Sequence, residues 1–376
     1  MEYLVAAGAL LWVALLLVPW RPWDTRERLE AIEAEAAPIL SDLTVLVPAR
    51  NEAASIRRTL PALKKQGADL KIVLVNDQSS DETVSIARST LGTGLSVIDG
   101  TSLPDEWTGK LWALEQGFRT IGTELVLLLD ADIELERGMV GALKQKLLGE
   151  KLDLVSIMAW LRMETFWEKL LAPAFIYFFK LIYPFSFGNS PDSRLGVAAG
   201  GCILVRADAL RKAGAFWSIR NAIIDDCALA SQVKACGGRT WIGLSRSVRS
   251  HRPYPRFAIF CEMVARTAYT QLRYSIGLLL ATTLLMALVF LSPFLGLSLP
   301  SLAARCFALM GVCAMLASYL PTLRYYHRSG FWALTLPLVG CLYLVMTWAS
   351  AVRFWQGKPS EWKGRSLHRS QISRDL

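Results

Sequence analysis

Four short apolar runs lie between residues 43 and 129, separated by stretches in which apolar residues recur at helical spacing. The runs occupy residues 43–48, 71–76, 95–98 and 124–129. Runs so poor in polar side chains are typical of strands that are buried on both faces of a sheet. Helices are predicted over residues 53–66, from Ser80 or Asp81 to Gly92, and over residues 110–121. This alternation predicts an α/β fold with a doubly wound, mostly parallel sheet.

The pattern after residue 132 is looser but still predicts several elements. Residues 152–157 favour a strand, and residues 223–236 favour a helix that ends at Gly237. Residues 166–182 repeat large apolar side chains at helical spacing, with Lys169 and Lys180 outside that stripe. A core helix and a helix lying in a membrane interface both fit this stripe. Residues 256–274 are amphipathic and precede the last apolar segments.

Four long segments carry no charged residue, namely residues 3–20, 274–304, 306–323 and 329–352. A helix needs about 20 apolar residues to cross a hydrocarbon core, so transmembrane helices are predicted near both ends of the chain. The first segment lacks the basic flank and the small-residue cleavage site of a signal peptide. We therefore expect it to be a retained membrane anchor.

The charge and cysteine content add two constraints. The 376 residues carry a net charge of +9, and basic residues flank the apolar segments. We attribute this charge to contact with an anionic membrane face and expect no nucleic-acid partner. The seven cysteines show neither metal-ligand spacing nor a disulfide pattern, which is typical of a reducing compartment.

Two carboxylates, Asp130 and Asp132, follow the apolar run at residues 124–129. Open α/β sheets bind their ligands beyond the carboxyl ends of the strands, which is where these two side chains are expected. Hard oxygen ligands suit Mg²⁺ or Mn²⁺. An isolated Asp-x-Asp is more often a simple turn. The motifs around it favour the metal site.

Five further motifs lie at predicted strand ends and helix starts. They are Pro48-Ala-Arg-Asn-Glu52, Asn76-Asp-Gln-Ser-Ser-Asp81, Gly109-Lys-Leu-Trp-Ala-Leu114, Ala199-Gly-Gly-Cys202 and Ile224-Asp-Asp-Cys227. Together with Asp130-Ala-Asp132, their order over residues 43–274 resembles that of the family 2 glycosyltransferases, which have a nucleotide-sugar-binding (GT-A-like) α/β fold. The apolar segments at both ends make the chain similar to the hopene-associated members of that family.

The resemblance implies roles for the residues on the donor side. Pro48, Ala49 and Glu52 would border the uracil and ribose, Asp77 would accept a hydrogen bond from the uracil ring, Lys110 would pair with the diphosphate, and Asp130 and Asp132 would hold the metal and the donor. A lysine at a helix start is well suited to a diphosphate, because the helix N-terminus also attracts anions.

The resemblance also implies roles on the acceptor side. Gly200 and Gly201 would form the loop around the sugar and the acceptor, and Asp226 would be the general base. Asp225 stands where the family usually has Glu. Adjacent helical positions point about 100° apart. We therefore expect Asp226 alone to face the reaction and Asp225 to be structural.

A last motif of the processive members, Gln-x-x-Arg-Trp, is not reproduced. The nearest stretch is Gln271-Leu-Arg-Tyr274, which is one residue short and has Tyr in place of Trp. Arg273 is the candidate phosphate contact in this stretch.

The implied enzyme is an inverting, metal-dependent glycosyltransferase that uses a nucleotide sugar, with UDP as the expected nucleotide. Its acceptor would be a membrane lipid such as a hopanoid. One alternative is a processive polysaccharide synthase, against which the broken last motif argues. Another is a membrane scaffold with an inactive nucleotide-binding domain, against which the retained carboxylates argue.

Five segments are predicted: an anchor at 1–22, a juxtamembrane linker at 23–42, a catalytic domain at 43–274, a transmembrane bundle at 275–352 and a basic tail at 353–376. The apolar segments at both ends imply a multi-pass protein of the cell inner membrane, and the use of a nucleotide sugar and the lack of a disulfide pattern imply the side on which the catalytic domain lies. Its catalytic domain would lie in the cytoplasm.

Overall fold

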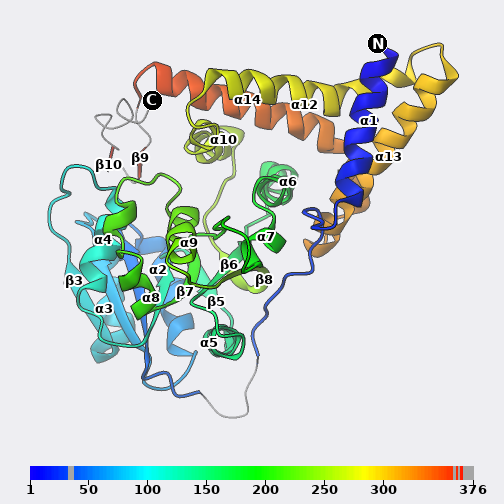
Figure 1. Ribbon diagram of the computed structural model, residues 1–376. Helices are drawn as coiled ribbons and strands as arrows, with labels where there is room; N and C mark the ends of the chain where they lie inside the picture. The colour runs from blue at the N-terminus through cyan, green and yellow to red at the C-terminus, as the bar shows by residue number, and fades with distance from the viewer. Residues whose placement is uncertain (33–37, 359–360, 363–364, 367–376) are drawn as a thin grey trace. The chain divides into compact units, whose positions relative to one another are not determined.

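The computed structural model describes residues 1–32, 38–358, 361–362 and 365–366, shown as the coloured ribbon of Figure 1. The chain forms two compact units, each made of separate segments. One, the α/β unit, contains Glu27–Arg162, Phe187–Pro253 and Pro359–Leu376. The other, the helical unit, contains Met1–Arg26, Met163–Ser186 and Tyr254–Lys358. Part of the predicted linker (33–37) and most of the predicted basic tail lie outside the described residues.

The α/β unit is built on an eight-stranded sheet with the order β3-β2-β1-β4-β7-β6-β8-β5. The strands are β1 (Leu43–Ala49), β2 (Lys71–Asn76), β3 (Leu95–Asp99), β4 (Leu125–Leu129), β5 (Ile133–Leu135), β6 (Leu154–Trp160), β7 (Cys202–Arg206) and β8 (Thr240–Ser250). A separate two-residue pair, β9 (Glu361–Trp362) and β10 (Arg365–Ser366), is antiparallel. The four runs predicted from the sequence are therefore strands, with ends shifted by one residue at most.

The sheet is mixed rather than uniformly parallel. Strands β3, β2, β1 and β4 run parallel to their neighbours, as predicted. Strand β7 is antiparallel to both β4 and β6, and β5 is antiparallel to β8. Strand β4 pairs with β1 on the side opposite β2, so the chain changes direction across the sheet at the β1–β4 boundary. Such a switch point is where open α/β sheets bind ligands.

Helices cover both faces of this sheet. Those of the α/β unit are α2 (Ala53–Lys64), α3 (Thr83–Leu91), α4 (Gly109–Phe118), α5 (Met139–Gly149), α7 (Phe185–Asn189, which begins in the helical unit), α8 (Ala207–Lys212) and α9 (Asp225–Ala235), with short 3₁₀ turns η1 (Gly92–Gly94) and η2 (Trp217–Ile219). Side chains of α2, α3 and α5 pack on one face, and those of α4, α8 and α9 on the other.

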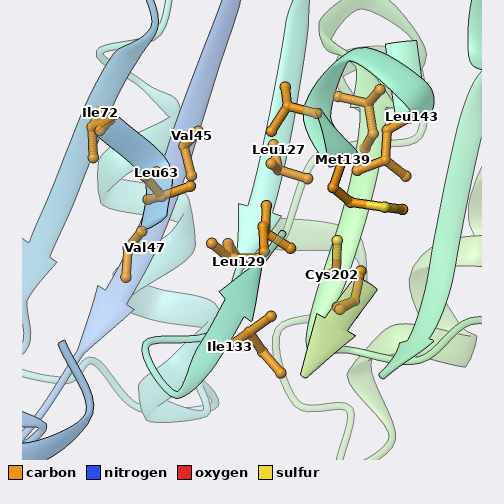
Figure 2. Packing of buried hydrophobic residues seen from close by; sticks show 14 of the residues in the cluster. Val45, Val47, Leu63, Ile72, Leu127, Leu129, Ile133, Met139, Leu143 and Cys202 are labelled. Atoms are coloured by element: carbon orange, nitrogen blue, oxygen red, sulfur yellow. The ribbon is translucent and has the colours of Figure 1, made fainter. Parts of the chain in front are cut away.

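The central strand β4 is buried on both faces, as its sequence predicts. Leu125, Leu127 and Leu129 belong to one core, and Val126 and Leu128 belong to the other. Figure 2 shows Leu127 and Leu129 between Val45 and Val47 of β1 and Cys202 of β7. Each fully buried side chain of this size contributes about 1.5–3 kcal/mol. The two cores therefore fix the end of β4, where Asp130 begins.

The segment before β1 contributes to the sheet. Leu29 donates a backbone hydrogen bond to Leu244 of β8, and Leu244 donates one to Glu27. The carboxylate of Glu30 accepts from the Ser245 hydroxyl and from the amide of Ser247. The described part of the predicted linker is thus extended and forms no helix there.

The helical unit contains the apolar segments. Its helices are α1 (Glu2–Leu17), α6 (Phe166–Ile182), α10 (Phe257–Ala265), α11 (Ala268–Gln271), α12 (Ile276–Leu297), α13 (Leu302–Tyr325) and α14 (Leu336–Trp355), with the 3₁₀ turn η3 (Gly330–Thr335). Within the described residues, α12, α13 and the stretch Gly330–Trp355 are long and apolar enough to cross a membrane. Helix α1 has 16 residues and is shorter than these three.

Helix α6 has the predicted bounds, but one of the two lysines expected outside its apolar stripe is buried. It packs against α10, α13 and α14, and its ends Phe166 and Ile182 are exposed. The side chain of Lys180, expected outside the apolar stripe, is buried, with Nζ 5.1 Å from the centroid of the Phe185 ring. Burial of a lysine costs less free energy when its ammonium group lies over an aromatic ring, because the ring attracts the positive charge.

Candidate active site

A pocket at the carboxyl ends of β1 and β4 contains five of the predicted site residues. It is lined by Pro48, Lys110, Asp130, Gly200, Asp225 and Asp226, and by apolar side chains of α4, β4, β7, α9 and the turn η2. These residues come from five separate parts of the sequence. The strand ends and helix starts to which the motifs were assigned therefore meet at one place.

Lys110 lies at the centre of the charged groups. It is the second residue of α4, whose start is capped by the Thr108 hydroxyl accepting from the Leu111 amide. Its Nζ atom lies 3.0 Å from Oδ1 of Asp130 and 3.3 Å from Oδ2 of Asp225. Burial alone would lower the pKa of Lys110, but the surrounding carboxylates outweigh burial and raise it. The lysine is therefore a fixed positive charge in the pocket.

Asp226 is held by backbone amides rather than by a cation. Its Oδ2 accepts from the amide of Gly200 at 2.8 Å, and its Oδ1 accepts from the amide of Cys227 at 2.8 Å. Burial, with a further contribution from the charge of Asp225, raises the pKa of Asp226 to about 6. A carboxyl group with this pKa is ionised at neutral pH and is still basic enough to accept a proton.

Both acids of the Asp225–Asp226 pair line the pocket. The expectation that Asp226 alone faces the reaction stays a prediction. They are the first two residues of α9, where no preceding helical turn covers their side chains. Asp225 points to Lys110, and Asp226 points to the Gly200 amide.

Asp130 and Asp132 flank the end of β4 in different surroundings. Asp130 is partly exposed beside Lys110, and its amide donates to the carbonyl of Gly201 at 3.0 Å. Burial and the negative charge of Asp132 raise the pKa of Asp130, against the opposing effect of Lys110. Asp132 is buried, and its Oδ2 accepts from the Ser250 hydroxyl at 2.8 Å.

The two loops after β1 and β2 are hydrogen-bonded to each other. The Asn51 side chain accepts from the Ser80 amide at 2.8 Å, and the Glu52 amide donates to the Thr83 hydroxyl at 2.8 Å. Asn51 adopts a left-handed φ of 52°, which Asn tolerates better than most residues. Neither Ser80 nor Asp81 is the residue immediately before α3, since Glu82 occupies that position. The Asp81 carboxylate nevertheless accepts from the Thr83 amide at 3.0 Å.

The residues expected around the nucleotide base lie on these loops. Asp77 is fully buried, its amide donates to the carbonyl of Ala49 at 2.8 Å, and its carbonyl accepts from Arg50 at 2.6 Å. Glu52 accepts from the Ser55 hydroxyl at 2.8 Å and lies 3.4 Å from a guanidinium nitrogen of Arg252.

Arg273 is not among the residues gathered around this pocket. It belongs to the helical unit, where it follows α11 with a left-handed φ of 50°. Its contact with phosphate stays a prediction.

Sequence analysis missed three residues that follow or end β8. Ser250 binds Asp132, the His251 amide donates to the carbonyl of Asp132 at 2.9 Å, and Arg252 pairs with Glu52. The His251 ring also pairs with Glu134. The available signal was the Ser-His-Arg sequence itself, because such polar residues at a strand end resemble those after β2 and β4.

Gly200 must stay small for the pocket to keep its form. A Cβ atom at this position would lie 3.1 Å from Nζ of Lys110 and 3.4 Å from Oδ2 of Asp226. We expect Gly200→Ala to lower turnover about tenfold, because displacing a reacting group by about 1 Å can cost two orders of magnitude. Steady-state kinetics would measure this loss. Gly122→Ala is the control, since a Cβ there meets nothing within 4 Å. Equal turnover in both variants would contradict this description of the pocket.

Part of the chain is similar to a known family of proteins. Residues 44–214 match the family described as "Glycosyl transferase family 2". The match begins in β1 and ends just after α8, so it includes the strand ends at Asp77 and Asp130. It stops before Asp225 and Asp226, whose roles depend on the geometry and the motif alone.

A similar relative is the 4,4'-diaponeurosporenoate glycosyltransferase of Staphylococcus aureus (strain USA300), which is 34% identical over 129 residues. The matched stretch spans 34% of this chain and 34% of the relative, so about a third of the relative's length is covered. Among solved structures, the mannosyltransferase PcManGT from Pyrobaculum calidifontis, in complex with GDP-Man and Mn²⁺, has a TM-score of 0.54 at 18% identity. That match covers 94% of this chain and 99% of the other, and it shows a shared fold. The family match and the relative support a glycosyltransferase domain.

Proposed function

We propose that the chain is an inverting, metal-dependent glycosyltransferase. It moves a sugar from a nucleotide sugar, with UDP as the expected nucleotide, to a hydroxyl group of a membrane lipid. The observation that carries this proposal is the pocket in which Lys110, Asp130 and Asp226 meet at a topological switch point of the sheet. A cation for a diphosphate and a separate carboxylate base are the two groups that such a transfer requires.

Lys110 and Asp226 have separate roles in the reaction. The ammonium group of Lys110 offsets the negative charge that develops on the departing diphosphate. Asp226 accepts the proton of the acceptor hydroxyl as its oxygen attacks the anomeric carbon from the side opposite the diphosphate. The amides of Gly200 and Cys227 keep this carboxylate oriented. One displacement inverts the anomeric centre.

The carboxylates after β4 fit a divalent cation. Asp130 and Asp132 are hard oxygen ligands, and burial together with the charge of Asp132 raises the pKa of Asp130. A divalent cation between the two carboxylates would offset their repulsion. No group of three or more such ligands gathers within the described residues. A cation at Asp130 and Asp132 would therefore share its remaining positions with water and diphosphate, as Mg²⁺ commonly does. When bound, it would act as a Lewis acid on the diphosphate.

Two observations support a lipid acceptor. The helical unit has three stretches that could span a membrane, which would hold the enzyme at a bilayer. The relative from S. aureus is named for diaponeurosporenoate, a lipid-like acceptor. A hopanoid or another polyisoprenoid alcohol is the specific acceptor that we propose, on the resemblance to the hopene-associated enzymes.

The proposal is tested by incubating the purified full chain with Mn²⁺, a bacterial lipid extract and one nucleotide sugar at a time. UDP-sugars are tried first, and GDP-mannose is included because the fold neighbour was solved with GDP-Man. We expect one lipid species to gain the mass of one hexose, and the Asp226→Asn variant to form this product at least about a hundred times more slowly. Transfer to a soluble oligosaccharide, with no lipid product from any donor, would contradict the proposal.

The cytoplasmic orientation leads to a separate prediction. The Asp208 side chain on α8 is 95% exposed, so a cysteine at that position can react with a soluble reagent. In a variant whose exposed Cys306, Cys313 and Cys341 are replaced, we expect Asp208→Cys to be labelled only after the cells are permeabilised. Labelling in intact cells by an impermeant maleimide would put the α/β unit on the outer side.

A further inference from the structure

The ammonium group of Lys110 forms ion pairs with two carboxylates that belong to different elements. Asp130 follows β4, Asp225 begins α9, and the ammonium group lies 3.0 Å from one and 3.3 Å from the other. All three side chains are mostly shielded, with exposed fractions of 17% for Lys110, 25% for Asp225 and 34% for Asp130.

We propose that Asp225 is a positioning residue that holds the ammonium group of Lys110 in the pocket so that it meets the donor diphosphate once Asp130 has bound the metal ion. This inference rests on the proposed function.

Asp130 would have two roles, as an ion-pair partner of Lys110 and as a ligand of the metal ion. A divalent cation bound to Asp130 repels the ammonium group, so the contact between Lys110 and Asp130 cannot persist unchanged beside it. Asp225 approaches the ammonium group from α9 and not from the metal ligands, so its contact survives the arrival of the cation. A lysine without this partner would regain the freedom of its four-carbon chain, and binding a diphosphate would again have to order it.

The neighbouring acid is held by different contacts. Both oxygens of Asp226 already accept backbone amides, from Gly200 and from Cys227. The first two residues of α9 thus have different roles. Asp225 orients a cation toward the donor, and Asp226 is left to take the acceptor proton.

The test is a double-mutant cycle on the binding of UDP, and of GDP in parallel, to the full-length purified protein with Mn²⁺ present, measured by calorimetry. We expect Asp225→Asn to weaken the binding of the preferred nucleotide about tenfold, within the range that directly interacting residues show. Lys110→Ala should weaken it at least as much, and the double variant no more than Lys110→Ala alone. Simple electrostatics predicts the opposite sign for Asp225→Asn, because removing a negative charge should favour an anionic ligand.

Three controls separate positioning from a structural role. Asp225→Glu should restore most of the affinity, because it keeps the charge. Asp208→Asn should leave affinity unchanged, because it breaks an exposed pair with Arg211 at 2.8 Å on a different helix. Mn²⁺ alone should bind Asp225→Asn as it binds the unmodified protein, measured by electron paramagnetic resonance. In kinetics with the preferred donor, Asp225→Asn should raise KM for the donor far more than it lowers kcat.

The proposal is overturned if the losses from Lys110→Ala and Asp225→Asn add in the double variant, or if Asp225→Asn binds the nucleotide as tightly as the unmodified protein or more tightly. A failure of the proposed function looks different. In that case the unmodified protein binds neither nucleoside diphosphate, and both proposals fall together.

Discussion

Asp226→Asn should lower turnover by about 10²–10⁴-fold, which is the usual contribution of a general base. The substitution keeps the shape of the side chain but removes its ability to accept a proton. Because Asp226 does not contact Lys110 or Asp130, the affinity for the donor should change little. Single-turnover transfer and equilibrium donor binding measure the two effects separately. Asp225→Asn should show the opposite pattern, because it should raise the KM for the donor and lower kcat less than Asp226→Asn does. The opposite ranking of these two variants would reassign the base.

The pH dependence provides an independent check of Asp226. Burial and the charge of Asp225 raise its pKa to about 6, so the carboxyl group becomes protonated as the pH falls below that value. The protonated form cannot accept the proton of the acceptor. We therefore expect kcat/KM to be level above pH 7 and to fall about tenfold per pH unit well below 6. A flat profile between pH 5 and 8 would exclude Asp226 as the essential base.

Asp132→Ala should abolish transfer and also weaken donor binding, because Asp130 alone binds a divalent cation poorly. The expected loss in turnover is at least as large as that of Asp226→Asn, since the substitution removes both charge stabilisation and donor affinity. Calorimetry of the donor with added Mn²⁺ and a transfer assay measure both losses. Asp99→Ala is a matched control, because Asp99 is also an acid at a strand end and pairs only with Asn76 among the contacts described here.

Chelation should reproduce this effect in the unmodified protein. Removal of divalent cations is expected to lower its activity to the level of Asp132→Ala, and re-addition of Mn²⁺ should restore only the unmodified protein. Full turnover in the presence of a chelator, together with an active Asp132→Ala variant, would remove the metal from the account.

The elements nearest the site follow from local sequence patterns. The run Leu125–Leu129 contains no polar side chain, and it is buried on both sides as a central strand must be. The polar residues that follow such a strand are then brought to the carboxyl edge of the sheet by topology alone. For that reason Asp77 and Asp130 could be expected at this edge of the sheet, whereas Lys110 and Asp226, which lie at helix starts, were selected only through the resemblance to the family's motifs.

Strand β8 could not be predicted in this way. Ser245 and Ser247 are buried in it, and serine in an apolar environment is costly without a hydrogen-bond partner. The partner is the carboxylate of Glu30, more than 200 residues earlier in the chain, at 3.0 Å from the Ser245 hydroxyl. A hydrogen-bond partner so far away in the sequence leaves no local pattern from which the strand could be predicted. Ser250, His251 and Arg252, which end or follow this strand, were missed because the strand itself was not predicted.

The role proposed for Asp225 was also beyond sequence patterns. Helical periodicity separates adjacent side chains by about 100° and led to the expectation that Asp226 alone faces the reaction and that Asp225 is structural. Lys110 and Asp130 approach α9 from another part of the sheet and give the second acid its own partner. Contacts of this kind depend on how the elements pack and not on their spacing along the chain.

The central claim is a single displacement at one pocket, with Asp226 as the base, and the configuration of the product tests it most directly. The glycolipid made by the purified protein from a nucleotide sugar of known anomeric configuration should be analysed by proton NMR at the anomeric position. An α-linked donor should give a β-linked lipid, and the Asp226→Asn variant should form it at least about a hundred times more slowly. An α-linked product would require a second displacement or a different mechanism, and would contradict the account.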